Sequence, residues 1–206
     1  MRKFYFLFAA VLFASISFGQ SAANYTFSTE TTGSLALDRN GAATDMSTGT
    51  TTLLAGGNDD VASSVVNIGF DFLFMGVNYT QFSASSNGFM RLGATAVATT
   101  ASSQTGTATG AIITAFGGDQ ATVTAAGANS KVHYKLFGTA PNRVLVVEWA
   151  NMKMNYSSYA TATAGNGTYQ VLIYETTGIV DLKYGAMSVA TTFSTGPVIG
   201  FSAGTT

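Results

Sequence analysis

The 206-residue chain contains no cysteine and a single histidine, His133. The absence of cysteine excludes a disulfide framework, a thiolate nucleophile, cysteine-ligated zinc, iron–sulfur clusters and a lipidated N-terminal cysteine. Charged residues make up only 9% of the chain, and nine Lys and Arg stand against ten Asp and Glu. Because no cationic surplus is available to neutralise phosphates, we expect no nucleic-acid partner.

The first residues have the pattern of an export signal. Arg2 and Lys3 precede an apolar run from Phe4 to Ile16, and the small residues Ser17 and Gly19 follow it. This order predicts a secretory signal peptide that ends at Gly19. The run is shorter than the roughly 20 residues that cross a bilayer, and no later stretch is apolar enough. We therefore expect a secreted, extracellular or cell-surface protein with no transmembrane span in the mature chain.

Beyond the signal peptide of residues 1–19, the composition is that of one β-rich domain over residues 20–206. The chain has 23 glycines and only two prolines, and its apolar segments are short with a period of two. The clearest is Ile68–Phe74, where an isoleucine and three phenylalanines at alternate positions share one face of a strand. Burying these side chains is worth roughly 1.5–3 kcal/mol each and requires a second layer. The sequence predicts an all-β fold, a two-sheet antiparallel β-sandwich preceded by a signal peptide.

Other segments add strands and turns to this prediction. Asn87-Gly88 lies between Tyr79–Ala84 and Phe89–Leu92 and favours a tight hairpin turn. The segment Val144–Trp149 is apolar on both faces, which predicts a central strand, and a short last strand is expected at Val198–Phe201.

Two segments give predictions about individual side chains. In Lys131–Leu136 the alternation places Val132, Tyr134 and Leu136 inward and leaves His133 exposed on the lysine-bearing face.

The second is the hairpin formed by Tyr169–Glu175 and Ile179–Tyr184. Pairing Glu175 with Ile179 puts Leu172 opposite Leu182 and collects the apolar residues on one face. Three tracts rich in Ala, Thr, Ser and Gly are predicted to be mobile loops or weak edge strands, namely Arg39–Gly57, Gly93–Gly110 and Ser157–Gly167.

A series of short motifs follows in order along residues 60–185. The first half contains Asp59-Asp60, Ile68-Gly69-Phe70-Asp71-Phe72, Gly76, Tyr79-Thr80, Phe82, Ser86-Asn87-Gly88-Phe89 and Leu92-Gly93. The second half contains Val132-His133-Tyr134, Gly138-Thr139-Ala140-Pro141-Asn142-Arg143, Glu148-Trp149, Tyr169–Glu175 and Gly178-Ile179. This order resembles the nidogen-like (NIDO-type) extracellular domain, in the version found at the N-terminus of large secreted Bacteroidetes surface proteins.

The resemblance implies a β-sandwich without catalytic activity that works in adhesion or matrix contact within a longer polypeptide. Two departures stand out. Ala115–Asp119 occupies the place where the family usually has a tryptophan and paired acidic residues. The chain also ends at Thr206, without the repeats and sorting segment that such proteins usually carry, which favours an N-terminal fragment of a longer protein.

Candidate catalytic groups are few. A glycosidase needs two facing carboxylates, and Glu148 and Glu175 are the best pair because both lie at strand ends. A serine hydrolase would have to use His133, but the chain has no Gly-x-Ser-x-Gly motif. We therefore expect no enzymatic activity and no cofactor.

One candidate metal site is present. Asp59 and Asp60, next to two glycines, offer the hard oxygen ligands that calcium prefers, and Asp45 and Asp119 are the acids that would have to complete the shell. The alternative is an acidic turn before a strand.

The function favoured by the sequence is adhesion or extracellular ligand contact, with an extracellular protein or glycan as the ligand. The alternative is an accessory carbohydrate-binding module of an exported hydrolase, for which Tyr156 and Tyr159, preceded by Met152 and Met154, are stacking candidates. Local packing of these four side chains is the competing interpretation.

Overall fold

The computed structural model describes residues 25–99, 110–124, 129–154, 165–188 and 197–203. Within these ranges the chain forms ten strands and no helix, so no described segment could cross a membrane as a helix. Sheet 1 contains, in spatial order, β1 (Thr51–Leu54), β6 (Lys131–Phe137), β7 (Val144–Met152), β8 (Gly167–Tyr174) and β9 (Val180–Met187). Sheet 2 contains β10 (Val198–Ser202), β5 (Ile112–Gly117), β4 (Phe89–Leu92), β3 (Val77–Ala84) and β2 (Val66–Phe74).

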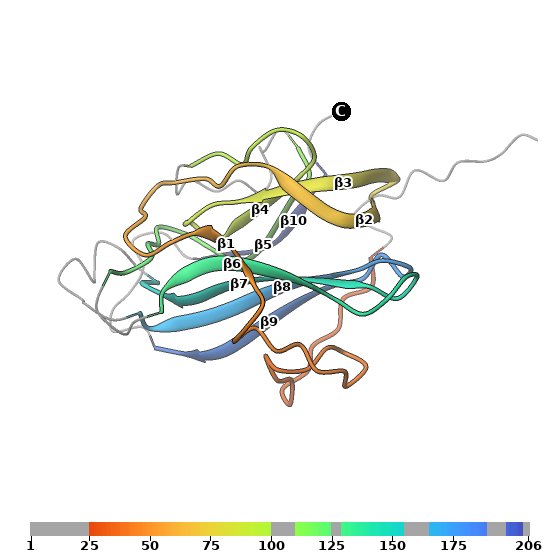
Figure 1. Ribbon diagram of the computed structural model, residues 1–206, viewed down its shortest axis with the longest axis horizontal. Helices are drawn as coiled ribbons and strands as arrows, with labels where there is room; N and C mark the ends of the chain where they lie inside the picture. Colours follow the sequence, from red (N-terminus) through yellow and green to blue (C-terminus); the bar gives the residue numbers. More distant parts are fainter. Residues whose placement is uncertain (1–24, 100–109, 125–128, 155–164, 189–196, 204–206) are drawn as a thin grey trace, which may run out of the picture.

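All strand pairs are antiparallel, and the two sheets stack face to face (Figure 1). The predicted all-β sandwich is therefore confirmed. The signal peptide falls outside the described residues and stays a prediction, as does the mobility expected for residues 100–109 and 157–164.

The core lies between the sheets and is built on the apolar stripe of β2. Buried and exposed residues alternate along this strand, and Phe72 and Phe74 are completely buried. Opposite them, β7 supplies Leu145, Val147 and Trp149 to the same cluster. The stripe thus has the second apolar layer that its alternation demanded.

β7 is buried on both faces because a second layer covers the outer face of sheet 1. Residues 34–50, which we call the strap, run across that face before β1 begins (Figure 1). Met46 of the strap packs on Val146, Leu172 and Tyr174 of sheet 1. The central position predicted for Val144–Trp149 is confirmed, and the strap accounts for its outward apolar residues.

Side chains of the sheet hold the strap by its backbone carbonyls. The Lys135 ammonium donates to the carbonyl oxygens of Asp45 at 3.0 Å and Thr48 at 2.8 Å, and the Gln170 amide donates to that of Leu35 at 3.2 Å. The predicted loop tract Arg39–Gly57 therefore consists largely of this strap, followed by the short edge strand β1.

The predicted register of the β8–β9 hairpin is wrong, and the strap explains why. The observed pairs are Leu172 with Asp181 and Val171 with Leu182, one residue away from the prediction. The prediction assumed one apolar and one polar face for β8, but β8 needs apolar residues on both. Val171 faces the inter-sheet core, whereas Leu172 faces the strap. Because the strap covers the outer face, a register shifted by one residue does not expose Leu172 to solvent.

The two ends of the sandwich differ. One end, the turn pole, carries the short β2–β3, β6–β7 and β8–β9 connections, on the right in Figure 1. The other end, the loop pole, carries the connections that follow β1, β3, β5, β7 and β9; those after β5 and β7 span residues 118–130 and 153–166. The β4–β5 connection returns toward the loop pole over sheet 2, where Val97 covers Phe89 and Ile112.

Candidate functional site

The β3–β4 turn at the loop pole is buried. The turn itself is as predicted, since Ser83 pairs with Arg91 and Ala84 with Met90. Asn87 is fully buried, and its amide bonds to three separate segments.

The Asn87 Nδ2 group donates to Oδ1 of Asp60 and to the carbonyl of Thr99, both at 2.7 Å. Its Oδ1 accepts the backbone N–H of Gln120 at 2.9 Å. One side chain therefore holds three loops in fixed positions, which is the role of a fully satisfied buried polar group.

A layer of aromatic and amide side chains supports this turn from below. The Tyr169 hydroxyl donates to Oε1 of Gln120 at 2.9 Å, and the Trp149 indole donates to the carbonyl of Ser85 at 2.8 Å. The two rings stack with centroids 5.3 Å apart. Burial raises the pKa of the Tyr169 hydroxyl well above its usual value, so it stays protonated and remains a donor. We call Trp149, Tyr169 and Gln120 the floor of the loop pole, because their contacts hold the β3–β4 turn in place.

Acidic side chains gather above this floor. Ala121 forms bridges with Asp59 on one side and with Lys153 on the other, so the three side chains point to the same face. Asp59 and the buried Lys153 are therefore the two neighbours of Ala121 on this face. Burial, reinforced by the neighbouring charges of Asp60 and Asp119, raises the pKa of Asp59; burial and the charge of Asp60 likewise raise that of Asp119. Ionisable groups perturbed in this way are concentrated at functional sites.

The structure brings together only part of the predicted calcium shell. Asp59, Asp60 and Asp119 influence one another electrostatically, whereas Asp45 lies on the strap beside Lys135. Oδ1 of Asp59 is buried without a hydrogen-bond partner among the described residues. The described part of the chain contains no group of three or more acidic or histidine side chains close enough to hold a metal ion. Lys153 lowers the pKa of Asp59 and Asp119, so it already supplies some of the positive charge that a cation would bring. Calcium at Asp59 and Asp60 stays a prediction.

The raised pKa values predict how this cluster affects stability. An acid whose pKa is higher in the folded than in the unfolded state favours folding least when ionised, so its contribution falls as the pH rises above about 4. We expect Asp119→Asn to raise the melting temperature at pH 7 and to leave it unchanged at pH 3, measured by differential scanning calorimetry.

The matched control is Glu30→Gln, an exposed acid in the N-terminal segment, which should change neither value. A lower melting temperature for Asp119→Asn at pH 7 would show that this carboxylate stabilises the fold and would contradict the prediction.

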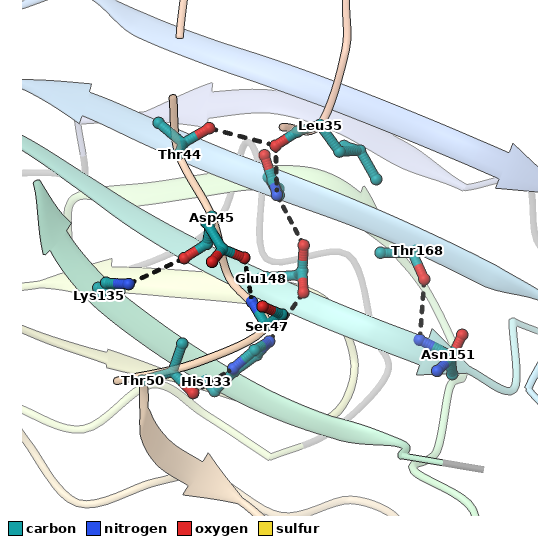
Figure 2. A network of polar contacts seen from close by, with 11 residues as sticks. Leu35, Thr44, Asp45, Ser47, Thr50, His133, Lys135, Glu148, Asn151 and Thr168 are labelled. Atoms are coloured by element: carbon teal, nitrogen blue, oxygen red, sulfur yellow. Dashed lines mark hydrogen bonds and ion pairs between the residues drawn. The ribbon is translucent and has the colours of Figure 1, made fainter. Parts of the chain in front are cut away.

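The expectation that His133 is exposed is wrong. Its side chain is only 1% exposed and lies under the strap, where Nδ1 contacts Oγ1 of Thr50 at 2.9 Å and Nε2 contacts Oε1 of Glu148 at 2.8 Å (Figure 2). The Gln170 amide donates to Oε2 of Glu148 at 2.6 Å. Leu136, predicted to be inward, is partly exposed at the turn pole. The strap reverses the environment that alternation alone assigned to the outer face of β6.

Glu148 and Glu175 do not face each other. Glu148 is held by His133 under the strap, whereas Glu175 forms an ion pair with Arg143, whose Nε donates to Oε2 at 2.8 Å. Arg143 and Glu148 are five residues apart along the chain, which corresponds to about 17 Å at about 3.3 Å per residue. The bonds from Arg143 lower the pKa of Glu175, so this carboxylate is not prepared to donate a proton.

The predicted stacking group is also divided. Met152 and Met154 are completely buried in the core, which confirms the packing interpretation for these two, and Tyr156 and Tyr159 lie outside the described residues. The exposed aromatic side chains among the described residues are Phe27 in the N-terminal segment and Tyr184 on β9, and neither lies in a loop of the loop pole.

Two five-stranded antiparallel sheets packed face to face define an all-β sandwich domain. A family profile described as NIDO related matches residues 24–206, and the chain belongs to this family. The nidogen-like part of the resemblance drawn from the sequence motifs is thereby confirmed, and the chain is an extracellular module, whereas the Bacteroidetes context stays a prediction. No curated protein and no solved structure gives a significant match to it.

Proposed function

We propose that this protein is a secreted or cell-surface module that makes non-catalytic contact with an extracellular ligand through its loop pole, as an adhesion domain does. The asymmetry between the two poles carries the proposal. Short β2–β3, β6–β7 and β8–β9 connections close the turn pole, whereas β1, β3, β5, β7 and β9 all end at the loop pole (Figure 1). Binding loops held by a rigid scaffold are the usual way in which a β-sandwich gains a ligand site.

The contacts below the loops support the same assignment. Asn87 ties three segments together, and the Trp149–Tyr169 stack fixes the turn from which it projects. Such fixing lowers the entropy that binding would otherwise cost. The acids above remain there although burial opposes their ionisation, which is a cost to stability that a binding role explains.

The absence of catalysis is part of the proposal. It is supported by the separation of Glu148 from Glu175 and by the arrangement around His133, where both ring nitrogens already have partners. Placement at the N-terminus of a larger Bacteroidetes surface protein follows from the motif resemblance and belongs to the same proposal.

Because the chain has no cysteine, a single introduced thiol tests the binding face directly. Thr124→Cys places the thiol at an exposed position on the loop pole, and Thr177→Cys places one on the turn pole as the matched control. Each variant of residues 20–206 is coupled to maleimide-polyethylene glycol, and its binding to arrays of matrix proteins and glycans is measured by fluorescence.

We expect the polymer at position 124 to weaken binding by at least about tenfold and the polymer at position 177 to have no effect, because the polymer sterically covers one pole only. Equal weakening by both, or binding of the uncoupled folded domain to neither class of ligand, would overturn the proposed function.

A further inference from the structure

A polar depression opens on the loop pole. It has a volume of about 270 Å³ and lies between the end of β7, the start of β8 and the end of β9. Asn151, Asn166, Thr168, Met187 and Ser188 are among the residues that line it. The volume is slightly below the roughly 300–1,000 Å³ of sites for drug-sized ligands, so it accommodates a single ring-sized unit.

The lining is held in place by a set of backbone bonds to one amide side chain. Asn166 accepts the backbone N–H of Met154 with its Oδ1 at 2.9 Å, and its Nδ2 donates to the carbonyl of Ser188. Its own N–H and C=O bond to Met152 and Ser188 at 2.8 and 2.9 Å. Asn166 therefore joins the ends of β7 and β9 across the depression and fixes its shape.

Asn151 is positioned by an unusual backbone conformation. It lies in a bulge of β7 with φ of 50°, and its N–H donates to Oγ1 of Thr168 at 3.0 Å (Figure 2). A left-handed conformation at a residue other than glycine is uncommon and is concentrated at functional sites. Gly165 passes so close that a Cβ there would lie 1.7 Å from the Asn151 carbonyl oxygen. The bulge therefore brings the Asn151 backbone against a neighbour that has no side chain.

The chemistry of this lining selects the ligand class. Amide, hydroxyl and backbone groups line the depression together with Ala186 and Met187, and no charged side chain is among them. We propose that the depression binds one unit of a neutral, hydroxyl-rich glycan. This inference rests on the proposed function, because it names the ligand class and the position of the contact on the loop pole.

A glycan fits these observations better than a peptide does. Neighbouring hydroxyl groups on a sugar ring act as donors and acceptors at once, which matches amide groups that offer both. An extended peptide would need a free strand edge or a long groove, whereas this site is one small depression between strand ends. An anionic or cationic ligand would find no charge partner in the lining.

The test uses residues 20–206 on an array of neutral glycans, followed by titration of each hit by isothermal calorimetry. Ala186→Phe fills the depression without removing a hydrogen bond, because Ala186 is an exposed lining residue. Asn151→Ala removes the amide, and Asn78→Ala changes an exposed asparagine near the turn pole as the matched control. Circular dichroism confirms that each variant is folded.

We expect Ala186→Phe to abolish binding, Asn151→Ala to weaken it by about five- to tenfold, the loss of one or two hydrogen bonds, and Asn78→Ala to leave it unchanged. Binding that survives both Asn151→Ala and Ala186→Phe in folded protein would overturn this inference. Failure of the folded domain to bind any neutral glycan, while it binds a matrix protein through the loop pole, would overturn the inference and leave the proposed function intact.

Discussion

Gly88→Ala is expected to destabilise the protein strongly. Gly88 has φ of 81°, a conformation that costs other residues about 1–2 kcal/mol. An added Cβ would lie 2.1 Å from the carbonyl oxygen of Phe116 and 2.7 Å from the Tyr169 hydroxyl. Neither neighbour can move without breaking the floor below the loop pole. We expect a loss of about 4 kcal/mol or more in the free energy of unfolding, a large part of the 5–15 kcal/mol of a typical domain.

The measurement is chemical denaturation followed by tryptophan fluorescence, which reports on Trp149 at the centre of this floor. Gly118→Ala is the matched control, because a Cβ at this nearby glycine would meet no atom within 4 Å and its φ is not in the left-handed region. A loss below about 1 kcal/mol for Gly88→Ala, or an equal loss for both variants, would show that the close packing around the turn is not needed for stability.

The β3–β4 turn shows which features the sequence predicts and which it does not. Asn87-Gly88 predicts a hairpin turn because the required backbone angles depend on two neighbouring residues. The same dipeptide contains no sign that Asn87 is buried, since its partners Asp60 and Gln120 are 27 and 33 residues away. Local sequence rules therefore predicted the hairpin turn, whereas the burial of Asn87 and its bonds to distant loops became visible only in the folded structure.

The outer face of sheet 1 illustrates the same limit. Alternation in β6 and β8 predicts one inward and one outward face, and this holds for Val132 and Val171 in the core. It fails for His133 and Leu172, because the strap reaches them from residues more than 80 positions earlier in the chain. A tract rich in Thr, Ser, Ala and Gly gives no periodic signal of such a covering layer. A histidine and a glutamate opposite each other in adjacent strands were the available hint.

The two candidate ligand sites could be predicted from the sequence to different degrees. Asp59 and Asp60 drew attention as oxygen ligands, with Asp45 and Asp119 as the acids that would complete the shell. The structure keeps Asp119 close to them, places Asp45 on the strap and adds the buried Lys153. The depression at Asn151 left no signal in the sequence that distinguished it from the many other polar loop residues. Its position depends on the register shift between β7 and β8, which pairs Met152 with Gly167 and leaves Asn151 in a bulge.

Glu148→Ala is expected to detach the strap from sheet 1 and to destabilise the protein by about 3 kcal/mol or more. Removing one member of a buried pair leaves the other without its partner, and such losses are typically about 3–5 kcal/mol. Here two buried groups, the His133 ring and the Gln170 amide, would lose bonds of 2.8 and 2.6 Å. Glu148→Gln should recover more than half of the loss, because an amide can still accept from one neighbour and donate to the other.

The effect on the strap is measured by hydrogen exchange together with urea denaturation. We expect Glu148→Ala to accelerate exchange at Thr44, whose N–H bonds to the carbonyl of Ala36 within the strap. Glu175→Ala is the matched control at the turn pole, where loss of the partly exposed pair with Arg143 should cost much less than loss of the buried contacts of Glu148. If Glu148→Ala proved no more costly than Glu175→Ala and left exchange in the strap unchanged, the buried contacts around His133 would not be what fastens the strap. Leu172 and Tyr174 would then have to hold Met46, and with it the strap, by apolar packing alone.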